Sequence, residues 1–166
     1  MRIVDLLKKD CIELGVKLNS KSEAIDKLVD LHNKAGNLVD AKVYKEGILA
    51  REAGGTTAIG DGIAIPHAKS EAVKEPALAV VTVPDGVDYE AMDGKPSNLI
   101  FMIAAPNDGD VHLEVLARLM TMLMDADFKN KLLNAPNKNA FLWAINELKK
   151  VKYPDEPAKK EQKDGY

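Results

Sequence analysis

Two short, uninterrupted apolar runs in the middle of the chain restrict its fold more than any other feature. Residues 77–83 read Ala-Leu-Ala-Val-Val-Thr-Val and end at a Pro-Asp-Gly sequence, 84–86, that favours a turn. Residues 98–105 read Asn-Leu-Ile-Phe-Met-Ile-Ala-Ala and stop at Pro106. Apolar runs of this length between turn residues are typical of buried strands. The chain is therefore predicted to build its core around a sheet.

Helical patterns lie on both sides of these strands. A Ser-Lys-Ser-Glu capping box at 20–23 opens a helix that Gly36 closes, and Asp40 is predicted to cap a second helix ending near Gly54. After the strands, apolar residues at helical spacing predict one face of a long helix: Leu113, Leu116, Ala117, Met120, Leu123 and Met124. Two further helices are predicted from the apolar anchors Phe128, Leu132 and Leu133, and from Phe141, Trp143, Ile145 and Leu148 within residues 137–149.

Two more strands complete the predicted sheet. Residues 11–16 alternate between apolar and polar and indicate a short edge strand, and residues 63–66 follow a Gly-Asp-Gly turn. Because helices precede and follow the strands, the fold class is α/β or α+β with a mixed β-sheet. At 166 residues the chain fits a single domain, to which we assign residues 1–150. Residues 151–166 are charged, contain two prolines and predict a solvated tail or a linker.

Composition excludes several classes of function. The formal net charge is -3 and aromatic residues are 5% of the chain, so nucleic-acid binding lacks both its basic surface and its stacking groups. No apolar run approaches the roughly 20 residues of a membrane helix, so direct membrane insertion is not expected. A single cysteine fits a reducing compartment, and the N-terminal sequence reaches charged residues too early for the apolar segment of a signal peptide, so we expect a cytoplasmic protein.

The sequence Gly-Ile-Ala-Ile-Pro-His at 62–67 is the strongest indication of a functional site. The strand predicted here ends at Pro66, whose fixed φ would hold His67 at a defined height and angle. The glycines at 60 and 62 allow the backbone to approach a ligand closely. A His placed in this way suits a nucleophile, a general base or a ligand. The structural alternative is a buried His whose ring is satisfied by its neighbours.

Two further residues are candidates for the same site. His112 follows a Pro/Gly/Asp loop after a buried strand, and strand ends and helix starts line the ligand crevices of open α/β sheets. Arg51 lies on a helix that ends in glycines, and its permanently charged guanidinium matches phosphate oxygens as a fork. Taken alone, each has an ordinary alternative, as a surface His or a solvated charge. Together with His67 they point to a nucleophile that handles an anion.

Other residues that often carry chemistry are assigned to structure. His32 lies near the C-terminal end of the first helix, where an imidazolium would complement the helix dipole. Cys11 has no second cysteine as a partner, and a half-buried, inert thiol is expected. The Gly-Asp-Gly sequence at 60–62 lacks the third glycine of a dinucleotide fingerprint and precedes a strand. No Walker loop, His-x-x-x-His or Cys-x-x-Cys pattern indicates a cofactor or a metal.

Three blocks of sequence resemble the EIIA domain of the fructose–mannitol class (type 2) of the bacterial phosphoenolpyruvate-dependent sugar phosphotransferase system. The blocks are Leu-Ala-Arg-Glu at 49–52, Gly-Asp-Gly-Ile-Ala-Ile-Pro-His at 60–67 and His-Leu-Glu-Val-Leu-Ala at 112–117. The middle block is highly specific, and the resemblance extends from Met1 to about Lys150. Residues 91–96 and 101–106 are most similar to fructose-type members.

The resemblance implies a mixed sheet flanked by helices and a phosphoryl relay without metal or cofactor. His67 would accept the phosphoryl group from the phosphohistidine of HPr, as a tele-phosphohistidine, and pass it to a Cys of an EIIB domain, which serves the membrane component EIIC. His112 would hydrogen-bond the phosphoryl group, and Arg51 would stabilise its charge. Asp61 stands where the family often has an acidic residue. The sugar, fructose or a related hexose or hexitol, would not bind this chain directly.

The physical chemistry of phosphoryl transfer agrees with these roles, since it asks mainly for positioning and charge stabilisation. A relay also needs weak and fast docking of its partners. Ile63, Ala64 and Ile65 are predicted to form an apolar contact patch around His67.

Two other functions fit parts of this pattern. Nitrogen-branch relatives of the same fold carry the same His but regulate other proteins by phosphorylation-dependent binding, and segments 91–96 and 101–106 favour the sugar branch instead. A metal hydrolase using His67, His112 and Asp61 is the weaker alternative, because metal ligands are usually spaced more closely.

Overall fold

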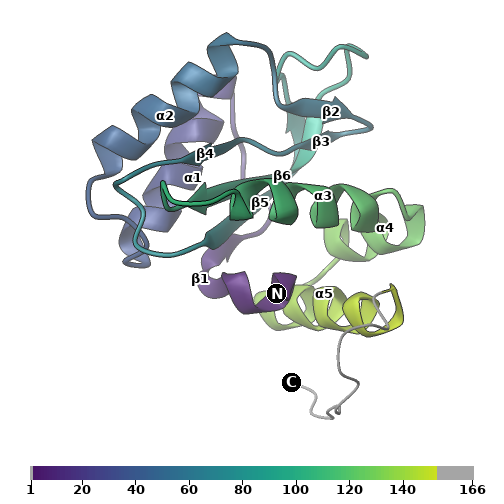
Figure 1. The fold of residues 1–166 in the computed structure, drawn as a ribbon. Coiled ribbons are helices and arrows are strands. Elements are labelled where there is room, and N and C mark those ends of the chain that lie inside the picture. The colour runs from purple at the N-terminus through teal and green to yellow at the C-terminus, as the bar shows by residue number, and fades with distance from the viewer. Residues whose placement is uncertain (1, 153–166) are drawn as a thin grey trace.

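The computed structural model describes the backbone of residues 2–152 and the side chains of residues 2–146. Its centre is a six-stranded mixed sheet with the order β1-β5-β6-β3-β2, in which β4 also pairs with β6 (Figure 1). The strands are β1 (Leu7–Glu13), β2 (Ala58–Gly60), β3 (Ile63–Ala64), β4 (His67–Lys69), β5 (Ala77–Val87) and β6 (Ser97–Ala105). The helices of the described residues are η1 (Ile3–Leu6), α1 (Lys21–Lys34), α2 (Ala41–Ala53), α3 (Val111–Leu123), α4 (Ala126–Leu133) and α5 (Lys138–Lys152).

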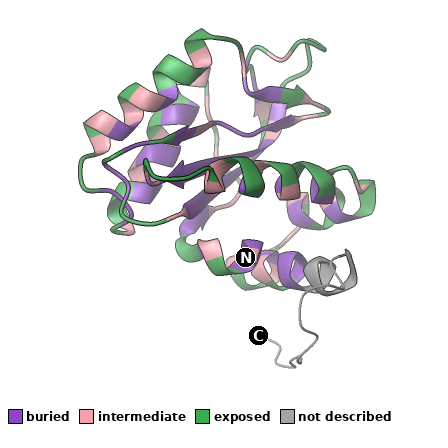
Figure 2. Ribbon diagram, viewed as in Figure 1, coloured by how far each residue is buried: buried purple, intermediate pink, exposed green. Residues whose placement is uncertain are grey.

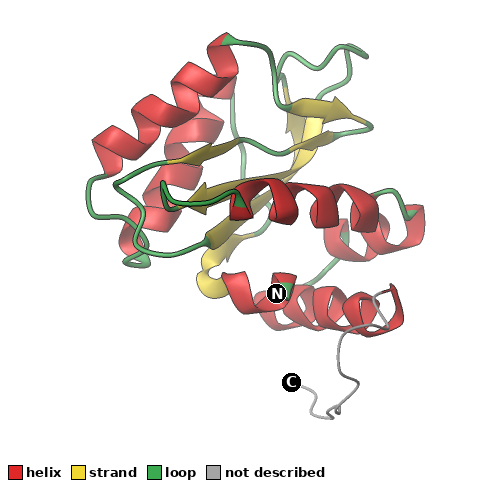
Figure 3. Cartoon of the chain, viewed as in Figure 1, coloured by secondary structure: helices red, strands yellow, loops and turns green. Residues whose placement is uncertain are grey.

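Helices flank the sheet on both sides (Figure 3). The α1–α2 pair packs over one side, and α3, α4 and α5 follow on the other (Figure 1). The antiparallel pair β5 and β6 lies between these layers, and buried residues follow its length (Figure 2). This arrangement confirms the predicted single α/β domain with a mixed sheet. Among the described residues, no helix is both long enough and apolar enough to cross a membrane.

The strand that leads to His67 is longer than predicted. Both β3 and β4 run parallel to β6 in one register, with Ile63 opposite Leu99 and His67 opposite Ile103. The ladder is interrupted where Pro66 lacks an N–H, yet the chain keeps its direction along β6. The prediction that the strand ends at Pro66 is therefore wrong: His67 opens β4, the continuation of the strand, and the chain pairs with β6 as far as Lys69.

The Pro-Asp-Gly sequence at 84–86 is a bulge and not the predicted turn. Strand β5 continues through it to Val87, with a shift of register against β6 between Thr82 and Val87. Gly86 has a φ of 78°, and a Cβ atom built on it would lie 2.7 Å from the Cβ of Pro96. Glycine is needed here both for the left-handed backbone and for the close approach of that neighbour.

The predicted starts of α1 and α2 are confirmed. The Oγ of Ser20 accepts the N–H of Glu23 at 3.1 Å, and the Glu23 carboxylate returns to the N–H of Asn19 at 2.9 Å, one residue earlier than in the standard capping box. The carboxylate of Asp40 accepts the N–H groups of Lys42 and Val43. Strand β1 is at the edge of the sheet, as predicted, but it spans Leu7–Glu13 instead of residues 11–16.

The predicted inner face of α3 is largely wrong, because this helix is apolar on more than one side; among the predicted residues, Leu123 alone is buried. The buried residues are Val115, Leu119, Met122 and Leu123. Leu113 is 52% exposed and Met124 85% exposed, so the predicted stripe is rotated toward solvent. In α5, Phe141 and Ile145 are buried as predicted, Trp143 is 43% exposed and is not an anchor, and the side chain of Leu148 lies outside the described residues.

His32 is a buried structural residue whose ring is satisfied in its neutral form. Its Nε2 lies 3.1 Å from the carbonyl oxygen of Met102, and its Nδ1 lies 3.0 Å from the Nδ2 of Asn37. Since the carbonyl can only accept, Nε2 carries the proton and Nδ1 accepts from the amide. Burial lowers the pKa of His32 to about 4. The ring is therefore neutral at pH 7, and the predicted imidazolium at the end of α1 is wrong.

The protein is expected to lose stability as the pH falls from about 6.5 to about 4, between the ordinary pKa of His32 and its pKa in the folded chain. In this window the unfolded chain binds a proton at His32 that the folded chain does not, so acid favours unfolding. The full loss, reached below about pH 4, is about 3 kcal/mol. Denaturant unfolding of the wild type and of His32→Gln across this range measures it. The variant should lack this part of the pH dependence; equal slopes for both proteins would contradict the assignment.

Cys11 is more deeply buried than the predicted half-buried thiol, with no exposed surface. Its Sγ lies 3.7 Å from the carbonyl oxygen of Leu31 and 3.5 Å from the Nδ2 of Asn37. Burial raises the pKa of the Cys11 thiol, which keeps it protonated and unreactive.

Candidate functional site

His67 presents one ring nitrogen with its lone pair unengaged by the hydrogen bond that holds the ring. The ring is half-buried, and its Nδ1 lies 2.9 Å from the carbonyl oxygen of Ile65. Because a carbonyl only accepts, Nδ1 carries the proton and the lone pair of the neutral ring is on Nε2. The imidazole is thereby held in one tautomer, with Nε2 as its basic atom.

The backbone around His67 fixes the carbonyl that holds its ring. The N–H of Ile65 donates to the carbonyl of Thr57 at 3.0 Å, and the carbonyl of Pro66 accepts the N–H of Ile103 at 2.9 Å. The side chain of Ile65 has no exposed surface. The acceptor of the His67 Nδ1 proton therefore belongs to a segment tied on both sides to the sheet.

His112 lies beside His67 across the space between β4 and α3. The centroids of the two rings are 6.4 Å apart, with the planes tilted by 33°. Burial lowers the pKa of His112, and the electrostatic effects of Lys69 and His67 lower it further against the opposing effect of Asp110. Its Nδ1 is buried and has no hydrogen-bond partner among residues 2–146. A neutral His112 that carries its proton on Nε2 would be able to give a hydrogen bond to an anion bound at His67.

Lys69 adds a cation to this pair, and sequence reasoning missed it. Residues two apart in a strand point to the same face, so Lys69 shares the face of β4 on which His67 lies. Its Nζ donates to the carbonyl of Gly109 at 3.0 Å and lies 3.4 Å from the Oδ1 of Asp110. Lys69 therefore ties β4 to the start of α3, where His112 lies. The His-x-Lys spacing within a strand was the available signal.

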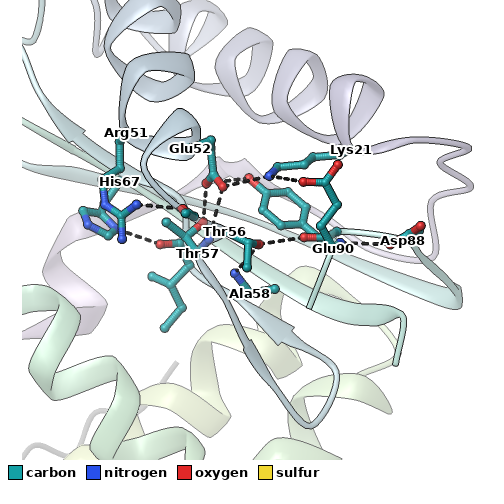
Figure 4. A network of polar contacts seen from close by, with 12 residues as sticks. Lys21, Arg51, Glu52, Thr56, Thr57, Ala58, His67, Asp88 and Glu90 are labelled. Carbon is teal, nitrogen blue, oxygen red and sulfur yellow. Dashed lines mark hydrogen bonds and ion pairs between the residues drawn. The ribbon is translucent and has the colours of Figure 1, made fainter. Parts of the chain in front are cut away.

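Arg51 reaches the site from the last turn of α2. Helix α2 packs closely on β4, since a Cβ atom built on Gly47 would lie 3.5 Å from the Cβ of Ala68. Arg51 follows Gly47 by one helical turn on the same side of α2. Its Nη1 donates to the carbonyl of Gly55 at 2.8 Å, and its side chain extends toward His67 (Figure 4). The guanidinium is exposed and remains available to an anion.

Asp61 is not brought to this site. It occupies the turn between β2 and β3 with a φ of 56°, and the five residues 62–66, which include β3, separate it from His67. Its N–H donates to the Oδ2 of Asp93 at 3.0 Å, and its carbonyl accepts the Nζ of Lys129 at 2.7 Å. The structure therefore joins Arg51, His67 and His112 and leaves Asp61 outside.

The position of Asp61 also weakens the metal-hydrolase alternative, which needed it beside both His67 and His112. Within the described part of the chain, no three His, Cys, Asp or Glu side chains gather into a group that could hold a metal ion.

The predicted apolar contact patch is wrong. Ile63, Ala64 and Ile65 are at most 4% exposed, because both faces of this part of the sheet are covered. Exposed apolar side chains adjoin the site residues elsewhere: Leu113 follows His112 and is 52% exposed, and Leu49 precedes Arg51 by two residues and is 46% exposed. Apolar contact surface near the site is thus supplied by the helices.

Sequence comparisons support a relation to known phosphotransferase components. The family model described as "Phosphoenolpyruvate-dependent sugar phosphotransferase system, EIIA 2" matches residues 5–148. The chain is 46% identical over 148 residues to the fructose-specific EIIABC component of Bacillus subtilis, covering 89% of this chain and 23% of that relative. It is 42% identical over 130 residues to the fructose-specific EIIA component of Haloferax volcanii, covering 78% of this chain and 84% of the relative.

Solved structures share the fold. The nitrogen regulatory protein IIA-Ntr from Neisseria meningitidis superposes with a TM-score of 0.80 at 27% identity, covering 86% of this chain and 98% of that one. Enzyme IIAMTL from Escherichia coli, in its complex with phosphorylated enzyme IIBMTL, gives a TM-score of 0.74 at 26% identity, covering 86% and 99% of the two chains. With the family model matched over residues 5–148, the chain belongs to the EIIA type 2 family of the phosphoenolpyruvate-dependent sugar phosphotransferase system.

Proposed function

We propose that this chain is a phosphocarrier that accepts a phosphoryl group on the Nε2 of His67 from the phosphohistidine of HPr and passes it to a Cys of an EIIB domain. The observation that carries the proposal is the His67 ring itself, held by the Ile65 carbonyl with Nε2 as the nucleophile. The neighbouring His112 and the approach of Arg51 supply the groups that an incoming phosphoryl anion needs.

The transfer exchanges one nitrogen–phosphorus bond for another. The bond between phosphorus and the HPr imidazole breaks, and its electron pair returns to that ring. The Nε2 lone pair of His67 forms the new bond, while the proton on Nδ1 stays in place. The His67 ring then gains positive character, and the hydrogen bond from Nδ1 to Ile65 strengthens. Arg51, Lys69 and His112 offset the charge of the phosphoryl oxygens, so transfer needs positioning more than acid–base catalysis.

The partners are expected to dock on the helices around His67. Leu49 on α2 and Leu113 on α3 are exposed apolar side chains next to the site residues Arg51 and His112. Docking there would cover His67 and exclude water from the transfer. One relative supports an EIIB partner, since Enzyme IIAMTL was solved with phosphorylated enzyme IIBMTL. We expect this relay in the cytoplasm, with EIIB handing the group on to a sugar bound by membrane EIIC.

Fructose is the proposed sugar of the whole system, because the relatives from B. subtilis and H. volcanii are both described as fructose-specific. This chain spans 23% of the B. subtilis relative, whose name also includes the B and C components. The alternative is a regulatory EIIA of the nitrogen branch, favoured by the TM-score of 0.80 against IIA-Ntr. Both functions use a phosphorylated His67 and differ in where the group goes.

The destination of the phosphoryl group separates the two functions. Phosphoenolpyruvate, enzyme I and HPr are expected to load the chain with one acid-labile, base-stable phosphoryl group, detected as a mass increase of the intact protein. Adding fructose-type EIIB and EIIC with fructose should then remove the group within seconds, and omitting fructose should preserve it. Loading that no sugar system drains would favour regulation. A chain that phospho-HPr does not load at all would refute the phosphocarrier.

A further inference from the structure

Glu52 is a buried carboxylate next to Arg51 on the last turn of α2, and it forms the centre of a polar network (Figure 4). Its side chain is 5% exposed. Oε1 accepts the backbone N–H of Thr57 at 3.1 Å and lies 3.0 Å from the Nζ of Lys21. Oε2 accepts the hydroxyl groups of Thr57 and of Tyr89, the latter at 3.0 Å. Both oxygens of this carboxylate are therefore fully engaged.

Two partners of Glu52, Lys21 and Tyr89, are kept in the protonated forms that donate hydrogen bonds to its carboxylate. Burial lowers the pKa of Lys21, but hydrogen bonds to Glu52 and Glu90 raise it by more, so the ammonium stays charged. Burial raises the pKa of Tyr89, and the charge of Glu52 raises it further, so the hydroxyl remains a donor. Glu90, 68% exposed, pairs with the same Lys21 at 3.1 Å. The network ties together α1, the end of α2 and the loop after β5.

Thr57 carries this restraint toward His67. It donates to Glu52 through both its N–H and its hydroxyl, and its own carbonyl accepts the N–H of Ile65 at 3.0 Å. The carbonyl of Ile65 in turn holds the Nδ1 of His67. Three consecutive contacts thus connect the Glu52 carboxylate to the nucleophile.

The same restraint reaches Arg51 by a shorter route. The carbonyl of Gly55, two residues before Thr57, accepts the Nη1 of Arg51 at 2.8 Å. Holding Thr57 against Glu52 keeps the segment 55–57 folded back along the end of α2. The guanidinium then has a fixed acceptor and a fixed direction. The backbone next to His67 is also hydrogen-bonded to β6, through the Pro66 carbonyl. The orientation of Arg51 rests on the Gly55 carbonyl, so we expect it to depend more strongly on Glu52.

We propose that Glu52 is a positioning residue for Arg51: it fixes the 55–57 segment so that the guanidinium meets the phosphoryl group on His67. This role rests on the proposed phosphocarrier function. A buried ion pair is weak support for stability, since apolar replacements of such pairs are often neutral. A carboxylate that binds four groups from three elements instead specifies one arrangement of those elements. Orientation of Arg51 is the functional consequence of that arrangement.

The test measures phosphoryl transfer from phospho-HPr to the full chain in single-turnover reactions, with the rate constant at saturating phospho-HPr (kcat) and the half-saturating phospho-HPr concentration (KM) determined separately. Glu52→Ala is expected to lower kcat about tenfold, because misplacing a charged group by about 1 Å has an effect of this order or larger, with KM for phospho-HPr unchanged. Glu52→Gln keeps the shape and can still bind Thr57, so it should recover most of the rate. In an Arg51→Met background, Glu52→Ala should reduce kcat by less than about twofold, because the group it positions is absent.

Glu90→Gln is the matched control, since it removes the charge of the exposed partner of the same Lys21 and should leave kcat unchanged. Thermal unfolding of each variant reports on folding. Equal losses of kcat from Glu52→Ala with and without Arg51 would show a purely structural role and overturn the proposal, as would an unchanged kcat. If Glu52→Ala does not fold, Glu52→Gln replaces it in the same comparison of wild-type and Arg51→Met backgrounds. It should lower kcat by a smaller factor in the wild-type background and leave kcat unchanged in the Arg51→Met background. A wild type that phospho-HPr does not load would refute the proposed function instead.

Discussion

His67→Ala is expected to abolish phosphoryl uptake from phospho-HPr. The alanine side chain has no nucleophile, and the other described histidines are poorly placed to replace it. His32 has no exposed surface, and both of its ring nitrogens are hydrogen-bonded within the core. His112 lies in the first turn of α3, and its Nδ1 is buried and so not accessible to a partner. Mass spectrometry of the intact variant after incubation with phosphoenolpyruvate, enzyme I and HPr should therefore show no added phosphoryl group.

The matched control for this experiment is His112→Gln, which removes the neighbouring imidazole and keeps His67. It should still take up one phosphoryl group, at a lower rate, because a hydrogen bond to the transferred group is lost while the nucleophile is retained. Full loading of His67→Ala would contradict the role assigned to His67. If His112→Gln also took up no phosphoryl group in that case, the two roles would be reversed.

Arg51→Met is expected to lower the rate of phosphoryl transfer to His67 about 100-fold. The guanidinium is a charged fork that extends toward His67, where the proposed phosphoryl group would be bound, and removing one such stabilising donor typically costs two to three orders of magnitude. Methionine keeps an unbranched apolar stem, so packing of α2 on β4 through Gly47 and Ala68 should survive. Rapid-quench measurement of labelled phosphoryl transfer gives the rate.

Arg51→Lys separates charge from geometry. Lysine keeps the positive charge but lacks the planar fork, which donates to the Gly55 carbonyl and in the proposed role would also donate to the phosphate oxygens. Its rate should fall between those of the wild type and Arg51→Met. A wild-type rate for Arg51→Met would remove Arg51 from the site.

The elements that local sequence determines could be predicted closely. The run at 98–105 became β6 with one additional residue, because a continuous apolar stretch that ends at a proline has few other solutions. The starts of α1 and α2 were predicted from Ser20 and Asp40, whose side chains do accept backbone N–H groups. In both cases the determining contacts lie within a few residues of one another.

Predictions failed where distant partners decide the outcome. Residues 84–86 have turn chemistry, but pairing with β6 converts them into a bulge. The apolar residues of α3 do not select one face, and only the position of the sheet determines that Leu119 points inward and Leu113 outward. The imidazolium predicted for His32 from helix position became a neutral ring, because the core covers it.

The candidate site also contains residues that could be predicted from the sequence and residues that could not. Residue types and family resemblance predicted Arg51, His67 and His112, and the fold brings these three together. Glu52 and Lys69 were missed because their roles depend on contacts more than 30 residues away, with Tyr89 and Gly109. Asp61 was included by its position in a motif, yet the β2–β3 turn carries it away from the ring.

The nitrogen that carries the phosphoryl group tests the central claim most directly. The Nδ1 of His67 donates its proton to the Ile65 carbonyl, so the phosphoryl group is predicted on Nε2, as tele-phosphohistidine. Phosphorus NMR of the protein loaded by phospho-HPr, compared with the two free isomers of phosphohistidine at alkaline pH, distinguishes the nitrogens, and peptide mapping identifies the residue. A single tele-phosphohistidine at His67 is the predicted result. A phosphoryl group on Nδ1, or on any other residue, would contradict the account of how this fold aims its histidine.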